Sequence, residues 1–166
     1  MPFDYVISRV ASFIPVVLAL TVHEWAHARV ALQLGDDTAL REGRLTLNPL
    51  AHLDLVGTIL LPLLGVPFGW AKPVPVDPSR FRPDVTMGTG LLLTAAAGPV
   101  SNLILAMLSG AALRLADGVS ALALHPAAEA LLIRFTVINL AMALFKLFGS
   151  GAGDWVGALS SSLTGR

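Results

Sequence analysis

The sequence predicts an all-α polytopic membrane protein with about three core transmembrane helices, a short or re-entrant apolar segment and small interfacial β-strands. Of the 166 residues, 55% are hydrophobic and 13% are charged, whereas a soluble domain carries about 25% charged residues. Mean hydropathy is +0.74. One uncharged stretch is longer than the roughly 20 residues that a transmembrane helix requires. The length suits a single domain over residues 1–166.

The first predicted helix covers residues 5–35. Its sequence is apolar apart from Arg9 near one end and a polar cluster near the other. Pro15 is a position at which the helix can kink, and Gly35 with the two aspartates that follow it ends the helix. No small-residue cleavage site follows the apolar stretch, so we expect this segment to stay in the mature protein rather than to act as a signal peptide.

Residues 41–83 are predicted to form interfacial strands and a re-entrant segment. Residues 41–48 alternate polar and apolar side chains, as a short strand or hairpin does. Residues 56–71 are uncharged but contain several glycines and prolines, which disfavour a regular spanning helix. Residues 72–83 are rich in proline and predict an extended connection outside the hydrocarbon.

Two further helices are predicted, over residues 85–114 and 127–154. The first contains no charge before Arg114, and its small residues around Gly98 allow close approach of a neighbouring helix. The second is apolar for most of its length and ends at Asp154. We therefore expect a multi-pass protein whose main partner is the lipid bilayer.

Charge and cysteine content exclude several classes of function. Lys and Arg together number 11, as do Asp and Glu, so no basic field predicts a nucleic-acid partner. The chain has no cysteine, which excludes disulfides, thiolate metal ligands and a cysteine nucleophile. Any metal must be bound by histidine and carboxylate side chains.

The segment from His23 to His27 reads H-E-W-A-H. On a helix the two histidines stand one turn apart on one face, where both imidazoles can bind one Zn²⁺. Glu24 lies beside them and is the predicted catalytic general base. Each charged residue within an apolar helix costs roughly 3 kcal/mol on insertion scales, and a bound metal offsets that cost. A chance match or a structural histidine pair is the alternative.

A catalytic zinc needs a third protein ligand. Four residues elsewhere in the chain are candidates: His52, Asp54, His125 and Asp154. Asp154 is favoured because it ends the last apolar stretch. The residues alone support an ordinary interfacial carboxylate equally well.

The chain resembles the site-2 proteases, a family of intramembrane zinc metalloproteases, in a compact bacterial-type form without a PDZ or CBS domain. The matching segments occur in order: H-E-W-A-H, then Asn48-Pro49-Leu50-Ala51-His52-Leu53-Asp54, Gly57-Thr58, the run from Gly69 to Val76, and Ala97-Gly98-Pro99-Val100-Ser101-Asn102. The resemblance implies zinc-dependent hydrolysis of transmembrane protein or peptide substrates in a bacterial cell membrane. It also implies one zinc per chain, bound by His23, His27 and Asp154.

The last helix departs from the family pattern F-N-L-x-P-x-P-P-L-D-G. Phe145 and Asp154 have the matching separation, but Lys146 replaces the asparagine and residues 149–153 replace the prolines with a glycine-rich turn. In the family the asparagine is implied in holding substrate, so an impaired relative that binds membrane segments without cleaving them is the alternative function. The chain ends at Arg166 without the further helix of many relatives, which indicates a minimal form or a truncation.

Two other interpretations stay open. By resemblance, residues 41–48 and 71–76 are candidates for strand addition to a substrate, and a plain interfacial connector is an equal alternative. A small transporter that uses the histidines as a relay ranks third, because no pair of similar halves is visible. No feature of the sequence identifies substrate-binding residues or an oligomeric state.

Overall fold

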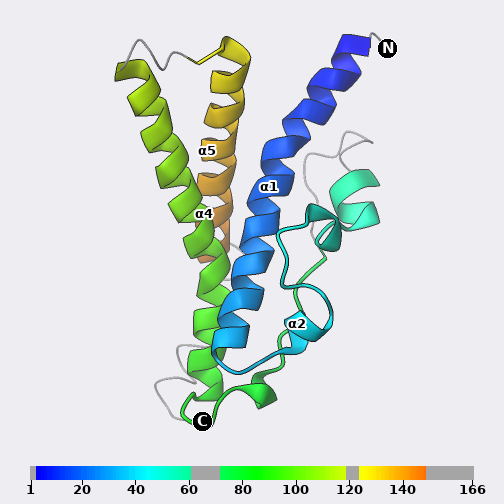
Figure 1. The fold of residues 1–166 in the computed structure, drawn as a ribbon, viewed down its shortest axis with the longest axis vertical. Helices are drawn as coiled ribbons and strands as arrows, with labels where there is room; N and C mark the ends of the chain where they lie inside the picture. Colours follow the sequence, from blue (N-terminus) through cyan, green and yellow to red (C-terminus); the bar gives the residue numbers. More distant parts are fainter. Residues whose placement is uncertain (1–2, 61–71, 119–123, 149–166) are drawn as a thin grey trace.

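The computed structural model describes residues 3–60, 72–118 and 124–148, and three long helices dominate this part of the chain (Figure 1). All three pack against one another. They are α1 (Phe3–Gln33), α4 (Met87–Gly118) and α5 (Pro126–Phe148). The shorter elements are α2 (Thr38–Arg41), η1 (Pro49–Ala51), η2 (Leu55–Leu60) and η3 (Pro78–Arg80).

Helix α4 contacts both other long helices, and its buried residues are mainly small. Its buried residues include a series with four-residue spacing, which places their side chains on one face of a helix. Small side chains allow the backbones of neighbouring helices to approach closely. The series comprises Gly90, Thr94, Gly98, Asn102 and Ala106.

The outward faces of α4 and α5 are apolar. Only 28% of the most apolar window of α4 is buried, and only 11% of that of α5. Large apolar side chains such as Leu108, Val137 and Phe145 are about 60% exposed. Within the described residues, α4 and α5 are the two helices that are long and apolar enough to cross a membrane.

The structure confirms that the chain is mostly helical, with different helix bounds from those expected. Helix α1 ends at Gln33 rather than at residue 35, α4 extends to Gly118, and α5 is described to Phe148. Three spanning helices were expected, and the described residues support two. Helix α1 is continuous over 31 residues, but its apolar stretch ends at the polar cluster that begins with His23.

The expected interfacial strands are wrong for the described residues, which contain no strand in 41–60 or 72–83. The backbone groups there have other partners. Gly43 turns the chain with φ +67°, and the Arg44 guanidinium donates to the carbonyls of Lys72 and Pro73. Prolines also lack the N–H that a strand ladder needs. The expected re-entrant segment is a π-helix over Leu55–Leu60, and its remainder, residues 61–71, lies outside the described residues.

The expected stop after α1 is present. Gly35 has φ +113°, a conformation that favours glycine at a helix C-terminus, and the Asp36 N–H donates to the Ala31 carbonyl at 2.9 Å. The Arg82 N–H donates to the Leu34 carbonyl at 2.8 Å. The chain therefore returns to the end of α1 just before α4 begins.

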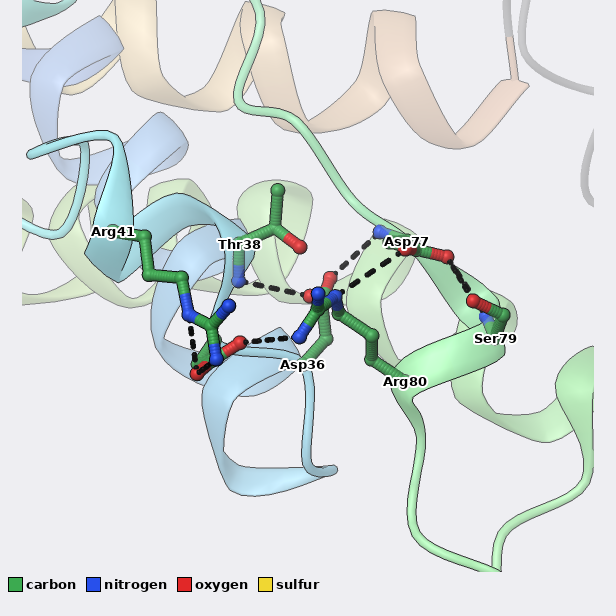
Figure 2. A network of polar contacts seen from close by, with 7 residues as sticks. Asp36, Thr38, Arg41, Asp77, Ser79 and Arg80 are labelled. Atoms are coloured by element: carbon green, nitrogen blue, oxygen red, sulfur yellow. Dashed lines mark hydrogen bonds and ion pairs between the residues drawn. The ribbon is translucent and has the colours of Figure 1, made fainter.

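Asp36 joins the loop after α1 to the loop before α4. Its carboxylate is fully buried and accepts from the backbone N–H groups of Thr38 at 2.9 Å and Asp77 at 2.7 Å (Figure 2). Ser79 donates from its hydroxyl and backbone to the Asp77 carboxylate, which lowers the pKa of Asp77. This polar network fixes the loops near the C-terminal end of α1.

Candidate metal centre

His23 and His27 lie together on the face of α1 that contacts α4. Their ring centroids are 4.6 Å apart with an interplanar angle of 84°, and His23 is buried. Gly98 of α4 lies directly opposite. A Cβ atom added to Gly98 would be 2.4 Å from His27 Nε2 and 2.5 Å from His23 Nε2. The two Nε2 atoms therefore converge on one small space that only glycine leaves open.

The backbone of α4 determines the tautomer of His27. His27 Nδ1 lies 2.6 Å from the Thr94 carbonyl oxygen, and a carbonyl can only accept, so Nδ1 carries the hydrogen. In the neutral ring Nε2 then has the free lone pair. A histidine that binds a metal through one nitrogen usually donates to a carbonyl or carboxylate from the other.

His23 has a second buried polar group next to it. The Asn102 side chain approaches His23 and is fully buried, with no hydrogen bond to either amide atom. His23 Nδ1 is likewise buried without a partner. Lys146 of α5 is also close enough to His23 to act on it electrostatically. Three helices thus contribute polar groups to the surroundings of this imidazole.

Glu24 lies beside the histidines and contacts a different part of the chain. Only 9% of the residue is exposed. Its Oε2 atom accepts a hydrogen bond from the Val74 N–H at 3.1 Å. The proline-rich segment before η3 therefore reaches the carboxylate that the sequence predicts as the general base.

The other candidate ligands are separated from the histidines or lie outside the described residues. His52 donates from Nε2 to the Thr46 carbonyl at 2.8 Å, since a carbonyl only accepts. Asp54 accepts from the Gly57 N–H at 2.7 Å at the start of η2. His125 accepts from the Ala127 N–H at 3.3 Å at the start of α5. Asp154 lies outside the described residues.

The described residues contain no group of three His, Asp or Glu side chains that could hold a metal. The pair that is present nevertheless fits zinc. Imidazole nitrogens are ordinary zinc ligands, and catalytic zinc sites take three protein ligands. Both Nε2 atoms face one space, and the hydrogen bond to Thr94 leaves one of them with its lone pair available. The contact between α1 and α4 therefore places two residues of a zinc-binding type side by side.

Sequence reasoning missed three contributions to the site. They are the open space at Gly98, the Thr94 carbonyl and the Val74 N–H. The four-residue spacing from Thr94 through Gly98 to Asn102 is the signal that could have placed the first two on one face. Backbone donors and acceptors leave no sequence signal of their own.

One relative links this geometry to a chemistry. Over 95 residues, 57% of this chain, the sequence is 52% identical to a protein of Bacillus subtilis (strain 168) named "Putative zinc metalloprotease YwhC". The match supports a metalloprotease family. The matched region spans 41% of that protein's length. No family model matches the chain, and no solved structure matches it.

Proposed function

We propose that this chain is a zinc-dependent intramembrane metalloprotease of the site-2 type, which hydrolyses peptide bonds of transmembrane or membrane-proximal substrates. One observation carries the proposal: the Nε2 atoms of His23 and His27 converge opposite Gly98, and the Thr94 carbonyl holds His27 in the tautomer that can bind a metal. The relative named as a zinc metalloprotease supports it.

The exposed apolar faces of α4 and α5 support a membrane location. The core helix of a soluble protein buries most of its apolar surface, whereas α4 and α5 leave most of theirs exposed. Exposed apolar surface of this extent is unfavourable in water but favourable against lipid tails. We infer a multi-pass protein of the bacterial cell membrane.

The proposed zinc ligands are His23, His27 and Asp154, with one zinc per chain. Bound zinc supplies a Lewis acid that polarises the scissile carbonyl and acidifies a water molecule. Glu24 accepts a proton from the attacking water and returns it to the leaving amine. The burial of Glu24 and His23 keeps bulk water away from these groups. Substrate helices must unwind locally, because their peptide bonds are sheltered by helical hydrogen bonds.

A second function is favoured by one observation. Helix α5 brings Lys146 near His23, at the position where the family pattern has an asparagine implied in holding substrate. A cation there disfavours a second cation in the same space. The alternative function is therefore an impaired relative that binds membrane segments without cleaving them.

The test is zinc content and proteolysis of the full chain purified in detergent. We expect close to one zinc per chain in the wild type and in Glu24→Gln, and a large loss in His23→Ala and Asp154→Ala. Asp117→Ala, which changes an exposed carboxylate on α4, is the matched control and should keep its zinc.

Cleavage of a generic transmembrane substrate separates the two functions. Cleavage by the wild type that is lost in Glu24→Gln supports the protease. Zinc without cleavage supports the impaired relative. An absence of bound zinc in the wild type would reject both metal-based proposals.

A further inference from the structure

Arg44 occupies an unusual position for a cationic side chain. It follows α2 in the sequence and is only 5% exposed. In the part of the chain that the structure describes, its guanidinium donates to three backbone carbonyls, those of Ala51, Lys72 and Pro73. A buried guanidinium is costly unless its hydrogen bonds are made. Carbonyl dipoles, rather than a carboxylate, satisfy its two terminal nitrogens, whereas Nε is buried without a hydrogen-bond partner among the described residues.

Two of these carbonyls immediately precede the residue that contacts Glu24. Arg44 holds the carbonyls of Lys72 and Pro73, and the next N–H along the chain, that of Val74, donates to Glu24 Oε2 at 3.1 Å. The Lys72 N–H donates to the His52 carbonyl at 3.1 Å. Residues 72–74 are thus fixed from both sides.

The sequence leaves residues 73–75 with one backbone hydrogen-bond donor. Pro73 and Pro75 flank Val74, and proline has no N–H and a fixed φ. Among residues 73–75, Val74 therefore carries the sole backbone N–H, and that group is directed at Glu24. A short, stiff segment of this kind can hold a carboxylate in one orientation with little freedom of its own.

We infer that Arg44 is a positioning residue for Glu24, acting through the backbone of residues 72–74. This inference rests on the proposed function, in which Glu24 is the general base. The Val74 N–H occupies Oε2 and fixes the carboxylate, so that Oε1 is the oxygen presented to water. A general base must be held within hydrogen-bond reach of the proton that it removes.

The first readout needs neither zinc nor activity. Amide hydrogen exchange at Val74 is measured by NMR on the full chain in detergent, with the Asp77 amide as an internal reference because it is bound by Asp36 instead. We expect exchange at Val74 to be about tenfold faster in Glu24→Ala and in Arg44→Gln, as for loss of one hydrogen bond. The Asp77 amide should stay protected.

Two variants control for general destabilisation. Arg41→Ala removes an exposed arginine that pairs with Asp37 and should leave exchange at Val74 unchanged. Arg44→Lys keeps the charge with fewer donors and should give an intermediate exchange rate. Unchanged exchange at Val74 in a folded Arg44→Gln protein would overturn the inference. Loss of protection at both Val74 and Asp77 would also overturn it, since Arg44 would then be a general anchor of the loops.

The second readout is kinetic. Arg44→Gln should keep wild-type zinc content and KM while kcat falls about 10- to 100-fold, the range expected when a catalytic group is misplaced. Unchanged kcat with increased exchange at Val74 would overturn the positioning role. If the wild type binds zinc and cleaves nothing, the proposed protease fails, whereas coupling of Arg44 to the Val74 amide is still decided by exchange.

Discussion

Helix α4 makes two different contacts, and two of its glycines show the difference. Toward α1, a Cβ on Gly98 would lie 2.4 Å from His27 Nε2. Toward α5, a Cβ on Gly110 would meet Thr136 Cγ2 at 3.9 Å, an ordinary van der Waals distance. The contact with α1 has its spacing set by the histidines, whereas the contact with α5 has room for a methyl group. The same residue type is thus required at one position and merely accommodated at the other.

Gly98→Ala should have the largest effect. The new methyl group must displace both imidazoles, so zinc per chain should fall to near zero. Overpacking of this kind costs about 1–3 kcal/mol of stability. Metal analysis and thermal unfolding of the purified protein measure both effects. Gly110→Ala is the matched control, and an equal loss of zinc in that variant would show that the two contacts do not differ.

Gly90→Ala should lower stability without affecting zinc. A Cβ at Gly90 would lie 2.3 Å from the Phe81 ring, so the ring must shift, at a cost of about 1–3 kcal/mol. This glycine is on the same face of α4 but away from the histidines. A reduced Tm with zinc content near the wild-type value would show that, of these two glycines, only Gly98 is required for zinc binding.

Thr136→Val tests the contact with α5. The Thr136 hydroxyl donates to Ser109 Oγ at 2.8 Å, and hydrogen bonds between membrane helices contribute about 0.6 kcal/mol on average. We expect a loss of that size in a denaturant titration and unchanged zinc content. Thr136→Ser keeps the hydroxyl and should behave as the wild type. A loss of several kcal/mol would show that this contact is as demanding as that with α1.

Arg41→Ala should have the smallest effect. Its side chain is 62% exposed and pairs with Asp37 at 2.7 Å, and exposed ion pairs contribute about 0.2–1 kcal/mol. The loss should shrink further as salt is raised. Zinc content that depends on Arg41 would contradict the separation of the outer polar network from the site.

Features with a local cause were predictable from the sequence. The spacing of His23 and His27 predicts one helical face, and the structure brings their rings together. Gly35 predicts the end of α1, which the structure places two residues earlier. These features depend on residues within one or two turns, where helical period and glycine conformation decide the outcome.

Features with distant causes were not predictable. The strands expected in residues 41–48 and 71–76 are absent from the described part of these segments, where Arg44 instead binds carbonyls 28 and 29 residues away. The small residues around Gly98 predicted a close helix contact but not that the histidines lie opposite. Nothing in the spacing of residues connects Val74 with Glu24, which are 50 residues apart. The role of Asp154 stays a prediction, since it lies outside the described residues.

The hydrogen bond between Leu34 and Arg82 has a consequence for the order of folding. It joins two residues that are far apart in the sequence, and the hydrogen bond from His27 to Thr94 spans 67 residues. Closure of such loops costs entropy that must be spent before the contacts form. The hairpin of α4 and α5 has a short connection, so we expect it to form early. The two histidines would then meet Gly98 late, and a metal site that needs both imidazoles would form only after α1 has packed against α4.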